Sequence, residues 1–126
     1  MTIQINHAIV AAYDRQASAA FFAEVFGLAQ PTEWGPFSTV LLGDGVHLHF
    51  AEPPGVTDIQ FQHYAFKVDD SQFDEIYTRV HDLSLEHWAD PQMRQPNQIN
   101  TNHGGRGVYF RDAAGHFLEV LTHSEV

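Results

Sequence analysis

Hydrophobic and polar positions divide the chain into two similar halves. In the first half, the apolar stretch 6–12 predicts a strand, and apolar residues at helical spacing follow it between Asp14 and Gly27. In the second half, the stretch 62–68 predicts another strand. The helix expected after that strand carries its apolar residues on one face, namely Phe73, Ile76, Tyr77 and Val80.

The expected helix caps support this division. Asp14 is the expected N-cap of the first helix, and Asp70 or Ser71 is that of the second, because short polar side chains accept hydrogen bonds from the first N–H groups of a helix. An offset of 56 residues carries Asp14 onto Asp70 and also His7 onto His63. The second half therefore repeats the first.

Each predicted helix is followed by further strands. The ranges are 38–42 and 46–51 in the first half, and 108–111 and 116–122 in the second. The second half also contains a longer polar loop, 89–106, which raises the offset to 70 for the last strands. On that register His49 corresponds to Glu119.

These elements predict an α+β fold made of two tandem βαβββ modules, 1–56 and 57–126, within a single domain. One short module of this kind cannot cover its own sheet, so two must pair. We expect the pair to form a half-open barrel around a metal site, with equivalent positions of the two modules facing one shared cavity.

Glu119 is the residue that suggests a metal. It stands in the middle of a predicted strand, where a buried carboxylate without a partner is costly and usually finds a cation. His7 and His63 occupy equivalent positions in the two first strands. Two histidines and one carboxylate form the set that suits Fe(II) and its neighbours. His49 is a possible fourth ligand, since it is the counterpart of Glu119.

Composition excludes several classes of function. The chain has 6 Lys and Arg against 16 Asp and Glu, a net charge of −10, which argues against nucleic acid or an anionic membrane as the partner. No apolar run is long enough to span a bilayer, and the N-terminus does not resemble a secretory signal. The absence of cysteine excludes disulfides and thiolate ligands. We expect a cytoplasmic protein that binds a small molecule.

Three segments together resemble the vicinal oxygen chelate superfamily, which includes glyoxalase I, extradiol dioxygenases, fosfomycin-resistance thiol transferases and bleomycin-binding proteins. The segments are Asn6-His7, the stretch 62–66 (Gln-His-Tyr-Ala-Phe) and the stretch 107–119 that ends at Glu119. In the enzymes of that family, residues matching His7, His63 and Glu119 hold a divalent metal. The substrate chelates this metal through two adjacent oxygens. The resemblance also implies a homodimer.

The stretch 102–115 is similar to the signature of the extradiol dioxygenases, although Ala113 replaces the proline of that signature and the gap after His103 is short. In those enzymes the matching histidine and tyrosine contact the substrate, so the resemblance gives His103 and Tyr109 catalytic roles. It also favours Fe(II) as the cofactor and ring or C–C cleavage as the reaction.

Other members of the superfamily give alternative functions. The fosfomycin-type thiol transferases match the three ligand positions but carry threonine where this chain has Ile9. Glyoxalase-type lyases use four ligands, which His49 could complete. Either alternative would suit Mn, Ni or Zn. A metal-free bleomycin-type drug-binding protein is the alternative that is not an enzyme.

Trp34, Tyr64 and Arg106 are the expected substrate contacts. Trp34 falls in what we expect to be a loop, 31–36, where binding residues are common, and Tyr64 adds aromatic surface for a flat ligand. Arg106 stands near the expected cavity. The loop 89–106 ends in two glycines and a further expectation is that it acts as a lid.

Overall fold

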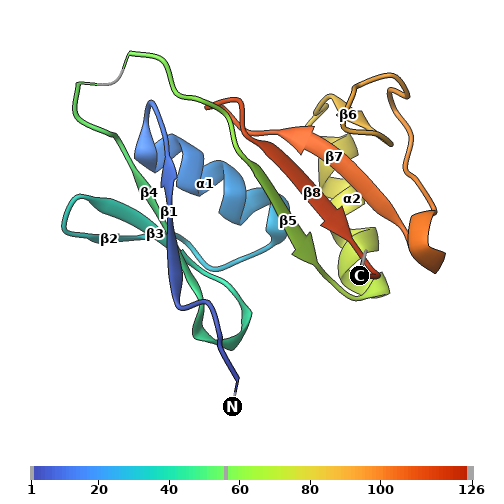
Figure 1. The fold of residues 1–126 in the computed structure, drawn as a ribbon, viewed down its shortest axis with the longest axis horizontal. Helices are drawn as coiled ribbons and strands as arrows, with labels where there is room; N and C mark the ends of the chain where they lie inside the picture. Colours follow the sequence, from blue (N-terminus) through green and yellow to red (C-terminus); the bar gives the residue numbers. More distant parts are fainter. Residues whose placement is uncertain (1, 56, 125–126) are drawn as a thin grey trace. The chain divides into compact units, whose positions relative to one another are not determined.

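The computed structural model describes residues 2–55 and 57–124 and contains two compact units, Met1–Gln60 and Phe61–Val126 (Figure 1). Residue 56, where we predicted the junction of the modules, lies outside the described residues. Among the described helices, neither is long and apolar enough to cross a membrane.

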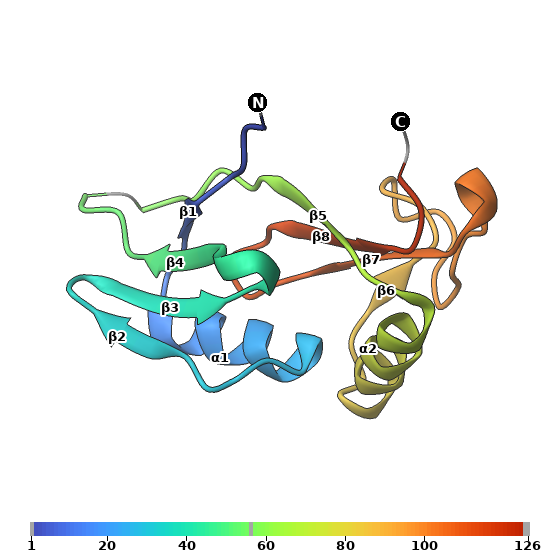
Figure 2. The same ribbon diagram turned by 90° about the horizontal axis from the view of Figure 1, so that it is seen from below.

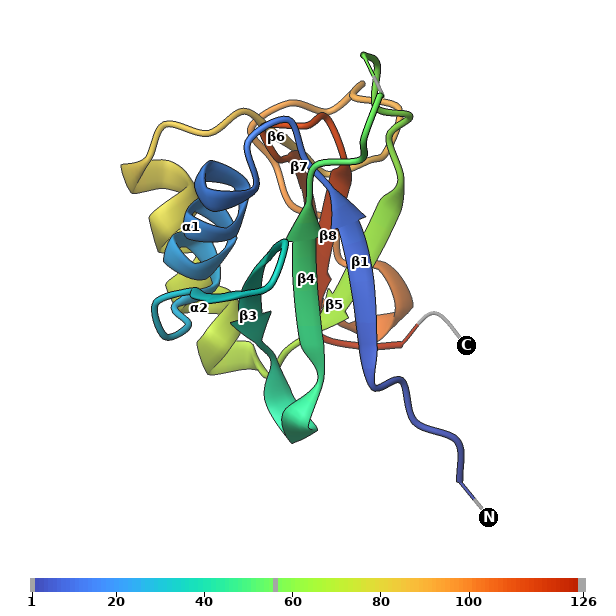
Figure 3. The same cartoon turned by 90° about the vertical axis from the view of Figure 1, so that its left-hand side faces the viewer.

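Unit one has the order βαβββ. Its elements are β1 (His7–Ala11), α1 (Arg15–Phe26), β2 (Thr32–Trp34), β3 (Phe37–Leu41), the 3-10 turn η1 (Gly43–Gly45) and β4 (His47–Ala51). The sheet order is β1-β4-β3-β2, and the first strand, β1, runs parallel to the last, β4 (Figure 3). Gly27 ends α1 in the left-handed conformation, at φ 70°, as the sequence predicted.

Unit two repeats this topology. Its elements are β5 (His63–Lys67), α2 (Asp70–Asp82), β6 (His87–Trp88), the 3-10 turn η2 (Asn102–Gly104), β7 (Gly107–Arg111) and β8 (Phe117–Leu121). The sheet order is β5-β8-β7-β6, with β5 parallel to β8. The predicted α+β class and the βαβββ order are confirmed, and each sheet is open. Every strand range predicted above agrees to within one residue at either end, but the short β2 and β6 were not predicted as strands.

Each sheet has one face covered by its own helix (Figure 2). In unit one, Phe22 of α1 contacts Phe50 of β4 with ring centroids 5.9 Å apart, and Val10 and Val40 are buried on the same face. Burying one such side chain contributes about 1.5–3 kcal/mol, so this face holds the unit together. Because side chains alternate along a strand, the other face carries the neighbouring residues. We call it the open face.

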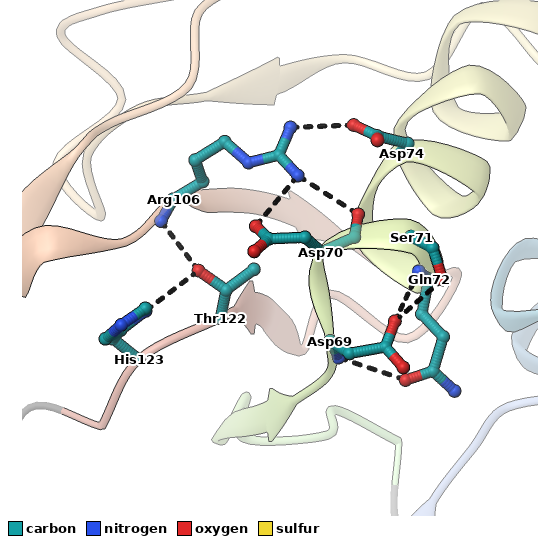
Figure 4. A network of polar contacts seen from close by, with 8 residues as sticks. All are labelled: Asp69, Asp70, Ser71, Gln72, Asp74, Arg106, Thr122 and His123. Carbon is teal, nitrogen blue, oxygen red and sulfur yellow. Dashed lines mark hydrogen bonds and ion pairs between the residues drawn. The ribbon is translucent and has the colours of Figure 1, made fainter.

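Asp69 is the N-cap of α2, so the prediction of Asp70 or Ser71 is wrong. The Asp69 carboxylate accepts a hydrogen bond from the Gln72 backbone N–H at 2.8 Å, and the Gln72 side-chain oxygen accepts one from the Asp69 N–H at 3.0 Å (Figure 4). This reciprocal capping box needs a glutamine or glutamate three residues after the cap, which only Asp69 has. The connection from β5 to α2 is therefore one residue shorter than that from β1 to α1.

The end of the loop 89–106 is fastened to α2. The Arg106 guanidinium donates to Asp74 at 2.7 Å and to the Asp70 carboxylate at 3.1 Å (Figure 4). It also lies 4.5 Å from the centre of the Phe73 ring. Gly105 is required here by close approach, because a Cβ atom would lie 2.5 Å from a ring nitrogen of His123. These contacts hold the end of the loop at α2, and the lid stays a prediction.

Replacing Asp69 by alanine should lower the free energy of unfolding by about 1 kcal/mol, because the first N–H groups of α2 lose their acceptor. Chemical denaturation of the purified variant measures this change. Asp69→Asn is the matched control, since the asparagine oxygen can still accept. Equal losses in the two variants would contradict the capping role.

Candidate metal centre

His63 and Glu119 lie side by side on the open face of unit two. The parallel register pairs Ala65 of β5 with Glu119 of β8, and His63 precedes Ala65 by two residues on the same face. The His63 Nε2 atom is 2.9 Å from the Glu119 Oε1 atom. The Glu119 side chain is only 6% exposed, whereas that of His63 is 48% exposed. A buried carboxylate thus has a partly exposed imidazole as its partner.

This pair has the donor chemistry and spacing of two metal ligands. Two ligands at right angles, each about 2.1 Å from a divalent first-row metal, lie about 3.0 Å apart. The observed separation of 2.9 Å matches this value. Tyr109 of β7 is paired directly with Glu119, and its ring centroid is 5.8 Å from that of His63. The structure therefore brings three of the predicted site residues together.

In unit one, the orientation of the His7 ring leaves one nitrogen for a ligand. The His7 Nδ1 atom lies 2.7 Å from the side-chain oxygen of Asn6. A carbonyl oxygen can only accept, so Nδ1 carries the proton and Nε2 of the neutral ring keeps its lone pair. Metal-binding histidines commonly have such an outer partner.

His49 lies beside His7 on the open face of unit one, with ring centroids 5.3 Å apart. Its Nδ1 atom shares a hydrogen bond of 2.8 Å with the hydroxyl of Thr39. In the register, His49 is paired with Ile9 just as Glu119 is paired with Ala65. The predicted correspondence of His49 and Glu119 is therefore correct.

Burial, followed by the charges of His7 and His47, lowers the pKa of His49 below its usual 6.5. The neutral form is the one that binds metals. His49 thus remains able to act as a ligand at a pH where an exposed histidine would be partly protonated. The folded state binds this proton less readily than the unfolded chain does, so the contribution of His49 to stability is lost as the pH falls below 6.5.

Within the part of the chain that the structure describes, no three His, Cys, Asp or Glu side chains gather closely enough to hold a metal. His63 and Glu119 lie together in unit two, and His7 and His49 lie together in unit one.

A hollow of about 490 Å³ opens next to His7 and His49 in unit one. Trp34 and Phe37 line it, and their rings lie within 25° of parallel to the His49 ring, at centroid distances of 5.3 and 4.9 Å. Trp34 is 64% exposed. It ends strand β2 and pairs with Phe37 across a tight turn, so the prediction that Trp34 lies in a loop is wrong. This hollow has the size and the aromatic walls of a small-molecule site.

Three other predicted site residues lie elsewhere. His103 is exposed in η2, at φ 58°, just before the start of β7. Tyr64 lies on the face of β5 opposite His63, where its ring contacts His116 edge-on and burial raises the pKa of its hydroxyl. Arg106 is committed to Asp70 and Asp74 of α2, as described above.

Two buried histidines that the sequence analysis did not single out have defined partners. His87 lies between the Tyr77 hydroxyl, at 3.2 Å from its Nε2 atom, and the Leu85 carbonyl, at 2.9 Å from its Nδ1 atom. His116 is 1% exposed and accepts a hydrogen bond from the backbone of Gln62. The partner of His116 is 54 residues away in sequence, so its position in the chain gave no signal, whereas the partners of His87 lie two and ten residues before it.

In metal-free protein, we expect the His49 imidazole to titrate below pH 6.5, because its burial disfavours the charged ring. Nitrogen-15 NMR of histidine side chains over pH 5–8 measures this directly. The His7→Gln variant removes one of the two repelling charges and should move the midpoint of His49 upward. A midpoint at or above 6.5 in the unchanged protein would contradict the assignment.

Comparison with known proteins agrees with the fold. Residues 4–120 match the family model of the glyoxalase/bleomycin resistance protein/dioxygenase superfamily. A metallothiol transferase, FosB of Shouchella clausii (strain KSM-K16), is 30% identical over 122 residues, which cover 94% of this chain and 79% of the relative. The solved structure of oxidase ChaP-H1 is 50% identical, covers 98% of both chains and superposes with a TM-score of 0.92.

A second solved structure, the fosfomycin resistance protein FosX from Mesorhizobium loti, has a TM-score of 0.70 at 22% identity, over 99% of this chain and 96% of that one, and it shows the shared fold. The match of the family model over nearly the whole chain, with a duplicated βαβββ unit, shows what the protein is related to. This chain belongs to the glyoxalase/bleomycin resistance protein/dioxygenase superfamily, the vicinal oxygen chelate superfamily.

Proposed function

We propose that this chain is a metal-dependent oxidising enzyme whose small aromatic substrate carries two adjacent oxygens, and that it cleaves a ring or C–C bond as the extradiol dioxygenases do. The observation that carries this proposal is the contact between the His63 imidazole and the buried Glu119 carboxylate on an open sheet face. Such a pair needs a cation or a proton to offset the cost of burying the carboxylate.

We propose His63 and Glu119 of unit two and His7 of unit one as the ligands of Fe(II), with His49 as a possible fourth. The bound metal would act as a Lewis acid and as a template for two substrate oxygens. Three protein ligands leave further positions open, which an oxidation requires. The 50% identity to an oxidase over nearly the full length of both chains supports an oxidation more strongly than the other reactions of the superfamily.

The residues around the pair have roles that follow from their positions. Tyr109 is buried beside Glu119 and near His63, so its hydroxyl is suited to give a proton to a substrate oxygen or take one from it. His103, by its resemblance to the extradiol signature, is the second candidate for this proton transfer. Trp34 and Phe37 would stack on the substrate ring and exclude water from one side of it.

A second candidate function, thiol transfer to a fosfomycin-like phosphonate, is supported by the FosB and FosA relatives at 30% and 29% identity. An anionic phosphonate requires cations. Arg15, Arg79 and Arg106 are already paired with carboxylates. Lys67 and Arg111 share the open face of unit two with Glu119, and they are the cations that a phosphonate would use.

We also propose that the protein acts as a homodimer, in which the ligands of one metal come from units of the same chain or of both chains. The proposed reaction does not depend on the oligomeric state, because His7, His63 and Glu119 are supplied whether the two units belong to one chain or to two. Size-exclusion chromatography with light scattering gives the number of chains in solution.

Protein purified anaerobically, without chelators or a polyhistidine tag, should contain about one iron per chain. The variants His7→Gln, His63→Gln and Glu119→Gln should each lose the metal. Losing a residue that only hydrogen-bonds to a ligand weakens metal binding roughly 10- to 100-fold, and we expect loss of a ligand itself to weaken it more. Elemental analysis and titration of the metal-free protein measure content and affinity.

His81→Gln is the matched control for the metal experiment, because His81 is an exposed histidine on α2 and should leave metal content unchanged. Stoichiometric Mn, Ni or Zn in place of iron would favour a lyase or the thiol transferase. Failure to take up any metal after reconstitution would overturn the enzyme proposal and favour a bleomycin-type binding protein.

Trp34→Ala should weaken binding of catechol-type ligands about fivefold or more. Stacking of the Trp34 ring on a ligand ring contributes about 1 kcal/mol to the binding free energy, in addition to the burial of apolar surface. Isothermal titration with a panel of catechols of increasing size measures the effect, with metal content checked in parallel. Leu41→Ala serves as the control, since Leu41 is an exposed apolar residue of the same sheet that does not line the hollow. Equal affinity in the Trp34 variant and the unchanged protein would remove Trp34 from the site.

A further inference from the structure

The side chain of His116 occupies the core of unit two, at the turn that joins β7 to β8. It is 1% exposed, and its Nδ1 atom lies 2.9 Å from the backbone nitrogen of Gln62. A backbone N–H can only donate, so Nδ1 must accept, and the proton of the neutral ring is on Nε2. The contact with Gln62 therefore requires the neutral His116 ring with its proton on Nε2.

Gln62 directly precedes His63, the first residue of β5. Its carbonyl accepts a hydrogen bond from the Phe117 N–H at 2.9 Å, and its own N–H goes to the His116 ring. In a longer strand, a backbone carbonyl would accept from that N–H. The imidazole takes the place of this carbonyl and extends the pairing of β5 with β8 by one step.

The backbone of His116 and its ring each have a further partner. The Asp112 carboxylate accepts hydrogen bonds from the backbone N–H groups of Ala114 and His116, at 3.0 and 2.9 Å. The Tyr64 ring meets the His116 ring edge-on, at 80° and 5.6 Å between centroids. Because the backbone, the ring and the tautomer of His116 are all defined, its Nδ1 atom can hold the Gln62 N–H in one position.

We propose that His116 is a positioning residue for the metal centre: by holding the N–H of Gln62, it fixes the start of β5 and so keeps the His63 imidazole within reach of Glu119. The metal part of this inference rests on the proposed function. His116 touches neither metal nor substrate and acts only through the backbone that carries His63.

Two substitutions separate the hydrogen bond from simple core packing. His116→Asn places an acceptor oxygen close to the position of Nδ1 and loses the rest of the ring. His116→Leu has a similar size to asparagine and has no acceptor. If only the volume of the ring matters, the two variants should behave alike. If the contact with Gln62 matters, asparagine should rescue what leucine loses.

The experiment combines a measurement on metal-free protein with one on metal binding. Amide hydrogen exchange of Gln62 and the nitrogen-15 signals of the His63 ring are followed by NMR in the metal-free variants. Binding of Fe(II) alone is titrated anaerobically. We expect His116→Leu to lose the protection of the Gln62 amide, to shift the His63 signals and to bind Fe(II) roughly 10- to 100-fold more weakly, as loss of an outer partner does. His116→Asn should stay within a few-fold of the unchanged protein.

Equal weakening in the asparagine and leucine variants would overturn the proposal, as would unchanged Fe(II) affinity in a folded His116→Leu protein. If His116→Leu does not fold, Gln62→Pro removes the N–H from the other side of the contact and should show the same changes at His63. If the unchanged protein binds no metal, the proposed function fails. The Gln62 and His63 signals of the metal-free variants still decide whether His116 positions His63.

Discussion

The parallel pairing of the first strand with the last strand in each unit is the constraint on which the candidate site depends. In unit two, β5 and β8 are about fifty residues apart in sequence, and their register sets Ala65 opposite Glu119. A slip of one residue would turn Glu119 to the helix-covered face, because side chains alternate along a strand. Burial of Leu118 and Val120 under α2 opposes that slip, since it would expose both side chains.

The same scaffold carries different chemistry in the two units. The position paired with the third residue of the first strand is His49 in unit one and Glu119 in unit two. His49 lies among nearly parallel aromatic rings, and burial lowers its pKa. Glu119 lies between an imidazole and the phenol of Tyr109. One unit therefore presents a flat aromatic surface, and the other presents a buried carboxylate with an imidazole and a phenol beside it.

Much of this arrangement could be predicted from the sequence, because it depends on local pattern. The hydrophobic pattern predicted the long strands and both helices, and the repeat of the two halves predicted that His7 corresponds to His63 and His49 to Glu119. The two- and three-residue strands β6 and β2 are too short to produce a period that can be recognised. Their pairing is decided by the neighbouring strands.

The N-cap at Asp69 could have been recognised from the sequence, because its partner Gln72 is only three residues away. The other partners that the sequence analysis missed are tertiary contacts. His116 depends on the backbone of Gln62, 54 residues away. Arg106 was expected near substrate from its place in the chain, but the fold gives its guanidinium two carboxylates and an aromatic ring. Spacing along a strand cannot reveal partners of this kind, because folding alone brings them together.

The distribution of acidic and basic residues bears on which of the two proposed reactions is favoured. With 16 acidic and 6 basic residues, the chain attracts a divalent cation more readily than an anion. Arg15 is the one Lys or Arg among residues 1–60, and it is paired with Glu33, so unit one has little positive potential to offer around its hollow. A substrate bound there would gain its affinity from ring stacking and would meet positive charge at the metal. This distribution favours an uncharged aromatic diol that loses its protons on binding over a phosphonate that arrives with full charge, and it is the physical reason to place oxidation ahead of thiol transfer.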